Sequence, residues 1–191
     1  VRHQLTEDVL KYIPRKYMTT IAAGLLTACL PAMAAPQLDT RELQTVTRMA
    51  RGIADQRGPD EAIAFLVRHK DDPRVLELLL EYAARADRSR EFVEVAAEQA
   101  AAQQENMAVQ EVYLRALHAA GMQDSLLPVA RRALEAAPDS TTEPFRRIGD
   151  LLNDFDMHSR ALEIYRRGRA AAGGGSAFGA EMAGTLVRMD R

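Results

Sequence analysis

The sequence predicts an all-α fold built from antiparallel helical hairpins that stack on one another. Hydrophobic residues make up 47% of the chain, but aromatic residues only 5%, and tryptophan is absent. A sheet core rich in large β-branched and aromatic side chains is therefore not expected. Apolar residues recur at helical spacing along most of the chain, which indicates amphipathic helices. The pattern itself repeats roughly every 35 residues, a period typical of stacked supersecondary units.

Residues 142–173 form the clearest hairpin. Their first helix has an apolar face at the i, i+3, i+4, i+7 spacing, made by Phe145, Ile148, Gly149 and Leu152. After a break near Asp156, the second helix has a similar face, made by Ala161, Leu162, Tyr165 and Gly168. We expect the two backbones to approach closely at Gly149 and Ala161. Such a unit cannot bury its apolar face alone, so neighbouring hairpins should cover it.

The same spacing recurs in residues 107–138, at an offset of 35, and in residues 73–104, at a further offset of 34. Gly121 is expected to make the turn of the former, and Asp87 stands in its place in the latter. An earlier copy has a shortened second helix. We therefore expect a repeat domain over residues 40–191, with repeats at about 43–72, 73–106, 107–141, 142–176 and a partial one at 177–191.

The partial repeat supplies a further first helix. Its small apolar residues fall in register with the apolar face of the clearest copy; they are Ala180, Ala183, Gly184 and Val187. Helix starts are indicated by Pro59-Asp60-Glu61 and by Ser140 or Thr141, which precede an acid and a proline. Pro128 is expected early in its helix, where the missing N–H is tolerated.

This pattern resembles the tetratricopeptide repeat family over about residues 43–191. The resemblance is carried in one copy by Ile148-Gly149, Leu152, Ala161 and Tyr165, and in the preceding copy by Tyr113, Leu117, Gly121, Ala133 and Pro138. The chain departs from the family at Asp87, Phe92 and Gln104, and no copy has the family's tryptophan. The resemblance implies a short right-handed solenoid whose first helices line a groove that binds extended peptides or partner helices.

Carrying the family register over places a set of charged residues towards that groove. With Arg48 and Arg51 of the first copy, the set comprises Arg74, Glu77, Glu81, Glu111, Arg115, His118, Arg146, Arg147, Asp150 and Arg188. Arginine recurs in every copy, which would suit carboxylates of a partner. The competing interpretation is that these charges simply keep an exposed helix face soluble.

Residues 1–36 have the pattern of a bacterial export leader. Basic residues precede an apolar run from Met18 to Leu30, and Ala32-Met33-Ala34 offers a small-x-small cleavage site. Alternatively, Leu26-Thr27-Ala28-Cys29 resembles a lipobox, which would place a lipid anchor on Cys29. A third possibility is an unprocessed, packed N-terminal helix. The first two interpretations place the working protein in the periplasm or at the outer membrane.

Other classes of function find no support in the sequence. The four histidines lie in separate segments without metal-ligand spacing, so no metal or other cofactor is expected. The sequence contains no GxSxG motif, and the glycine-rich stretch at 173–176 lacks the lysine of a phosphate loop. The net charge of −2 gives no general attraction to nucleic acid. We therefore expect a binding protein and not an enzyme.

Three functional hypotheses remain. The first is an exported scaffold that binds other proteins or peptides, for example in assembly of an envelope complex. The second is the N-terminal repeat module of a longer envelope exporter, pore or enzyme, because Val1 and Arg191 look like arbitrary ends. The third is recognition of an anionic polysaccharide by the arginines of the predicted groove.

Overall fold

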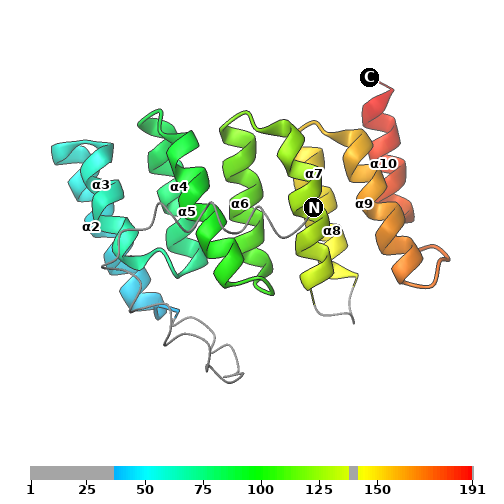
Figure 1. Cartoon of the computed structure of the whole chain (residues 1–191), viewed down its shortest axis with the longest axis horizontal. Helices are drawn as coiled ribbons and strands as arrows, with labels where there is room; N and C mark the ends of the chain where they lie inside the picture. Colours follow the sequence, from blue (N-terminus) through cyan, green and yellow to red (C-terminus); the bar gives the residue numbers. More distant parts are fainter. Residues whose placement is uncertain (1–36, 138–141, 191) are drawn as a thin grey trace, which may run out of the picture. The chain divides into compact units, whose positions relative to one another are not determined.

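The computed structural model describes residues 37–137 and 142–190. All regular secondary structure in these residues is helical, and successive helices pack in neighbouring pairs (Figure 1). The prediction of an all-α fold of stacked helical hairpins is confirmed. The predicted leader, with Cys29, lies outside the described residues, as do Pro138, Ser140 and Thr141. No described helix is both long enough and apolar enough to span a bilayer.

Helices of two kinds alternate along the described residues. The first helices are α2 (Thr40–Arg57), α4 (Pro73–Arg85), α6 (Met107–Ala119), α8 (Glu143–Asp154) and α10 (Gly179–Met189). The second helices are α3 (Pro59–Leu66), α5 (Ser89–Ala102), α7 (Gln123–Ala136) and α9 (His158–Ala171). Helix α3 has only 8 residues and continues into a 3-10 turn at Val67–His69. Successive first helices from α2 to α8 also contact one another.

Three of the hairpin turns share one backbone geometry. Asp87, Gly121 and Asp156 have left-handed φ angles of 57°, 73° and 58°. The next residue donates its N–H to the carbonyl five positions earlier, at 2.8 Å (Arg88 to Ala83), 2.8 Å (Met122 to Leu117) and 2.9 Å (Met157 to Leu152). This is the Schellman ending of a helix. The expected turn at Gly121 is confirmed, and aspartate adopts the same conformation in the other two hairpins.

The close approach expected in the α8–α9 hairpin is present at Gly149. A Cβ added there would overlap the ring of Tyr165, whose side chain is fully buried; its distance from Cζ would be 2.6 Å. Ala161 is also fully buried. Gly168 provides a second such position, because an added Cβ would lie 2.7 Å from Cβ of Phe145 and 2.8 Å from the Phe178 ring. The packing roles predicted for these small residues are confirmed.

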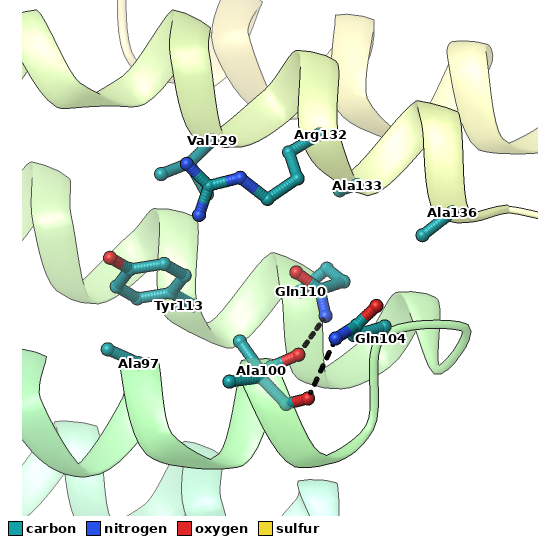
Figure 2. Close-up of a pocket in the computed structure, with 10 residues that line it drawn as sticks. Ala97, Ala100, Gln104, Gln110, Tyr113, Val129, Arg132, Ala133 and Ala136 are labelled. Atoms are coloured by element: carbon teal, nitrogen blue, oxygen red, sulfur yellow. Dashed lines mark hydrogen bonds between the residues drawn. The ribbon is translucent and has the colours of Figure 1, made fainter. Parts of the chain in front are cut away.

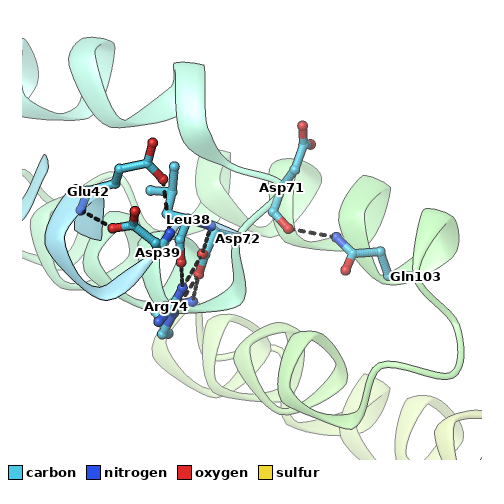
Figure 3. A network of polar contacts seen from close by, with 7 residues as sticks. All are labelled: Leu38, Asp39, Glu42, Asp71, Asp72, Arg74 and Gln103. Atoms are coloured by element: carbon cyan, nitrogen blue, oxygen red, sulfur yellow. Dashed lines mark hydrogen bonds and ion pairs between the residues drawn. The ribbon is translucent and has the colours of Figure 1, made fainter. Parts of the chain in front are cut away.

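A buried carboxylate ties the start of α2 to the start of α4 (Figure 3). Asp72 is 2% exposed and caps α4 by accepting the Arg74 N–H at 2.9 Å. It also accepts the Leu38 N–H at 3.0 Å and two guanidinium hydrogen bonds from Arg74. Burial alone would raise the pKa of Asp72, but the hydrogen bonds from Arg74 and Leu38 outweigh it and lower that pKa. Nearby, Asp39 and Glu42 form a capping box at the start of α2.

Two expectations about helix starts are corrected. Helix α8 begins at Glu143, with Thr142 at the N-cap and Pro144 in its first turn, because proline suits the first turn, where its missing N–H costs nothing. Pro128 is the sixth residue of α7 and lies inside the helix. The carbonyl of Asp124 therefore lacks its usual intrahelical donor.

The interpretation of residues 177–191 also needs correction. Helix α10 forms, but its predicted packing residues Ala180, Ala183, Gly184 and Val187 are exposed. The buried side chains at this position are instead Thr185, at 1% exposure, and Phe178, at 3%. On this inward side Phe178 and Met182 pack against the core, and the buried Asn153 Nδ2 donates a hydrogen bond of 2.9 Å to Thr185 Oγ1.

Candidate partner-binding surface on the first helices

Side chains at equivalent positions of α8 and α10 contact one another. Arg146 Nε on α8 lies 2.8 Å from Glu181 Oε1 on α10, 35 residues later in the sequence. The same register places Glu77, Glu111 and Arg146 in one row and Glu81, Arg115 and Asp150 in the next. We call the surface that carries these two rows the first-helix face.

Several of the predicted arginines already have a carboxylate within the chain. Arg74 is bound to Asp72 at 2.7 Å, and its Nη2 also donates to the Leu38 carbonyl at 2.6 Å. Arg146 contacts Glu143 at 3.2 Å in addition to Glu181, and this pairing with arginine lowers the pKa of Glu181. A partner carboxylate would therefore have to displace an existing ion pair at either arginine.

Glu111 and Arg147 close the seam between α6 and α8. Arg147 Nε lies 2.5 Å from Glu111 Oε1, an oxygen that is buried and receives no well-directed hydrogen bond. The contact is an ion pair between the two side chains. The Glu111 side chain is only 16% exposed, so this pair joins helices more than it offers a binding site.

Glu81, His118 and Asp150 also have partners within the chain. Glu81 forms an ion pair with Arg85 one turn later. The His118 ring stacks on Phe155, with centroids 4.0 Å apart and planes inclined by 3°, and its Nδ1 lies 3.2 Å from Gln123 Nε2. Asp150 remains exposed while it accepts the Tyr165 hydroxyl at 2.5 Å. Burial and the neighbouring Asp150 together raise the pKa of that hydroxyl.

Glu77, Arg115 and Arg188 are among the predicted residues that form neither an ion pair nor a side-chain hydrogen bond with a described residue. All three are exposed. Glu77 and Arg115 belong to the first-helix face, whereas Arg188 lines a shallow depression beside the α8–α9 turn, together with His158 and Arg160. Arg48 and Arg51 of α2 are also exposed. Six of the predicted residues fall in the two rows of the first-helix face by their register, whereas Arg188 lies beside the α8–α9 turn.

Sequence reasoning missed a small cavity between α5, α6 and α7 (Figure 2). Its volume is about 190 Å³, and its walls include Ala97, Ala100, Ala101, Ala133 and Ala136. Tyr113 and Arg132 provide the polar groups at this cavity, whereas Gln110 is held by the Ala100 carbonyl at 2.8 Å. Facing alanines in the two second helices were the available signal. Typical small-molecule sites enclose ~300–1,000 Å³, so this cavity suits one partner side chain better than a ligand.

Within residues 37–137 and 142–190, no three His, Cys, Asp or Glu side chains are grouped so that they could hold a metal ion. The titratable contacts described above are ion pairs and hydrogen bonds within single helices and between neighbouring ones. They fix the packing of the hairpins and leave exposed charge on the first-helix face.

Comparison with known proteins gives little beyond this geometry. No protein-family model matches the chain, and no curated protein matches it. One similar solved structure is that of "MamA RS-1 ArsTM double mutant"; it is 17% identical, the match covers 77% of this chain and 84% of that chain, and the TM-score is 0.42. The chain is a helical-repeat protein, and its resemblance to tetratricopeptide repeats rests on its own residues and helix packing.

Proposed function

We propose that this chain is a scaffold that binds partner proteins or peptides along its first-helix face. The observation that carries the proposal is the contact between Arg146 of α8 and Glu181 of α10. These two residues occupy equivalent positions of neighbouring first helices, so the contact makes charged residues of separate helices part of one surface. Stacked helical repeats characteristically use such extended surfaces for binding.

The mixture of charges favours a protein over an anionic polysaccharide. Arg115 is exposed, but its register neighbours Glu81 and Asp150 are exposed carboxylates, and so is Glu77. A uniform polyanion would be repelled by these three groups at the position where Arg115 attracts it. A folded protein or peptide can place charges of both signs opposite this pattern.

The proposal is tested at Arg115, because substitution there breaks no ion pair with a described residue. Affinity capture from envelope extract, with mass-spectrometric identification, first provides a partner. Arg115→Glu is then expected to weaken binding of that partner about tenfold, as at a peripheral hot spot. Arg90→Glu makes the same charge change at an exposed position of α5 and should leave affinity unchanged. Equal affinities for the wild type and for Arg115→Glu, Glu77→Lys and Asp150→Lys would contradict the proposal.

We further propose export to the periplasm or outer membrane, on the basis of the apolar run Met18 to Leu30 and the AMA site that follows. Cys29→Ser separates the two modes of export. A protein that leaves the membrane fraction on this substitution was lipid-anchored, whereas a processed soluble protein fractionates unchanged. The first-helix face would serve equally in the repeat module of a longer exporter, pore or enzyme. The coding DNA beyond Arg191 distinguishes a separate scaffold from such a module.

A further inference from the structure

Ion pairs join consecutive second helices on either side of the cavity between α5, α6 and α7. Lys70, which follows the 3-10 turn after α3, lies 2.8 Å from Glu98 of α5. Arg131 of α7 binds Glu163 of α9. Among the described residues, by contrast, no ion pair joins α5 to α7. The cavity thus lies where two consecutive second helices lack such a link.

The register of the repeats explains why the link is missing. Arg132 stands where Glu98 stands in the preceding copy, 34 residues earlier, and Gln104 stands in the place of Lys70. Both residues line the cavity. Gln104 Nε2 already donates to the Ala101 carbonyl at 3.2 Å, whereas Arg132 is exposed and forms no ion pair with a described residue. A position that is acidic in one pair of helices is therefore basic in the next, and it lacks a carboxylate.

The volume of the cavity has the same origin. Ala97 of α5 stands where Arg131 stands in the next copy, 34 residues later. Pro128 of α7 stands where Glu163 stands, 35 residues later. Both long side chains of the α7–α9 ion pair are therefore replaced by short apolar ones between α5 and α7. Space that these side chains fill in one pair of helices is open in the other.

Two hydrogen-bond donors at this cavity are available to a partner. Figure 2 shows the Arg132 side chain extending from α7 over the cavity towards Tyr113 of α6. The Tyr113 side chain is half-buried, and its hydroxyl forms no hydrogen bond with a described residue. Gln110, in contrast, is occupied by the Ala100 carbonyl. A guanidinium and a phenolic hydroxyl both donate to carboxylates, and such charge-assisted hydrogen bonds are the stronger kind.

We propose that this cavity binds a glutamate side chain of a partner protein. The methylene groups of the glutamate contact the alanine walls, and its carboxylate accepts hydrogen bonds from Arg132 and Tyr113. The partner thereby supplies the acid that Glu98 and Glu163 supply to the neighbouring pairs of second helices. The inference rests on the proposed protein-binding function, but it uses the second helices and not the first-helix face.

Other anionic groups fit this cavity less well. A phosphate group is usually bound by several arginines, whereas Arg132 is alone among the described arginines in lining the cavity. An aspartate has one methylene group fewer with which to contact the alanines. The cavity also lies inside the array, since helices α4 and α8 follow on either side of the three helices that form it.

A capped peptide with one glutamate between alanines, acetyl-Ala-Ala-Glu-Ala-Ala-amide, is the direct probe. Its titration into the full isotope-labelled chain should shift the backbone amide signals of residues 97–104 and 129–136 in NMR spectra, with a Kd of about 1–10 mM. The matched control is the same peptide with glutamine in place of glutamate, which should bind at least about tenfold more weakly. A peptide with aspartate should lie between the two.

Substitutions at the two donors test the polar contacts. Arg132→Gln should weaken binding of the glutamate peptide at least about tenfold. Arg90→Gln, at an exposed arginine near the start of α5, is the matched control and should leave the Kd unchanged. Neither arginine forms an ion pair with a described residue, so both variants should fold. Tyr113→Phe should weaken binding about threefold through loss of the hydroxyl.

A second pair of substitutions closes the site from within. Gln104→Glu places an acid beside the cavity that Arg132 lines, so it should weaken peptide binding about tenfold and raise the melting temperature by about 1–2 °C. Gln44→Glu makes the same change at an exposed position of α2 and should alter neither quantity. Ala101→Leu should fill the cavity and weaken binding, whereas Ala102→Leu, at an exposed position outside it, should not.

An acid of the chain itself is the competing occupant, and it can be tested directly. The acids outside the described residues, up to Arg191, are Glu7, Asp8 and Asp139. We expect the glutamate peptide to bind the unmodified chain and the variant with Glu7→Gln, Asp8→Asn and Asp139→Asn equally well. Binding that appears only in this variant would show that the chain occupies its own site, and would overturn the proposal.

Three further results would also overturn it. They are absence of binding at ~20 mM peptide, equal affinity for the glutamate and glutamine peptides, and tighter binding of an alanine peptide with a free C-terminal carboxylate. The last result would identify a chain terminus as the occupant. All of these results leave the outcome at Arg115 unaffected, so failure of this site and failure of the proposed function are distinguishable.

Discussion

At its N-terminal end the described repeat domain is tied by a buried carboxylate, whereas at its C-terminal end it is tied by a buried amide, an aromatic ring and a more exposed ion pair between Arg146 and Glu181. Asp72 joins α2 to α4 through Arg74 and Leu38, and the free side of α2 carries exposed polar residues such as Gln44, Thr45 and Arg48. Asn153 and Phe178 hold α10, whose free side is apolar. The two ends of the described domain therefore differ in the contacts that tie them and in the polarity of their free sides.

The largest expected effect comes from adding one methyl group to a first helix, at Gly149 of α8 or at Gly184 of α10. Gly149→Ala should lower the free energy of unfolding by about 3 kcal/mol, because its Cβ meets the immobile Tyr165 ring. Gly184→Ala, at the register position in α10, should raise that free energy by about 0.5–1 kcal/mol, since helix propensity improves and no atom is in the way. Urea denaturation followed by circular dichroism measures both. Equal effects would mean that α9 does not pack on α8 as described.

An effect of intermediate size is expected at the N-terminal end of the described domain, where the Asp72 carboxylate is buried. The pKa of Asp72 is lowered in the folded state, so its contribution to stability is complete above its unfolded pKa of about 3.8 and is lost as the pH falls through the folded value. Hydrogen exchange in α2, measured by mass spectrometry after pH-matched labelling, should therefore accelerate on acidification below about pH 4. At neutral pH, Asp72→Ala should cost about 1–2 kcal/mol through loss of the N-cap.

Glu181, at the C-terminal end of the described domain, provides the control for the effect of acidification. The pairing of Glu181 with Arg146 lowers the pKa of Glu181 as well, so its contribution changes with pH in the same direction. Glu181 is 23% exposed, whereas the Asp72 side chain is 2% exposed. Asp72→Asn should consequently flatten the pH dependence more than Glu181→Gln does. The reverse order would contradict the contrast between the two ends.

The smallest expected effect concerns turns that both halves of the domain share. Asp87 and Asp156 adopt left-handed φ angles, which cost a non-glycine residue roughly 1 kcal/mol. Asp87→Gly and Asp156→Gly should each raise the free energy of unfolding by about 0.5–1 kcal/mol, and with it the melting temperature. Asp154→Gly, at the last residue of α8, should instead lower it by up to a similar amount. Similar gains in stability at Asp87 and Asp156 would show that the two ends differ in the contacts that hold their helices and not in the conformation of their hairpin turns.

Local patterns made the hairpins predictable from the sequence. The spacing around Ile148, Gly149 and Tyr165 encodes the α8–α9 hairpin, and Gly121 marks its own turn by requiring positive φ. Apolar periodicity could not reveal which side of α10 faces inwards, because Thr185 is recruited by the distant Asn153. For the same reason, periodicity predicted exposed arginines on the first helices but could not show that Glu111 and Glu181 already pair with Arg147 and Arg146. Side-chain pairing across repeats depends on the assembled fold.

Asn153 has a consequence for how the domain opens. Its Nδ2 contacts both Thr185 Oγ1, at 2.9 Å, and the Tyr165 hydroxyl, at 3.2 Å, while its Oδ1 lies 3.1 Å from His158 Nδ1. A single buried amide thus links α8, α9 and α10. Departure of α10 would leave this amide short of a partner, which is costly, so loss of α10 should proceed as one step and not as gradual fraying. Native-state hydrogen exchange should show α10 exchanging as a single cooperative unit.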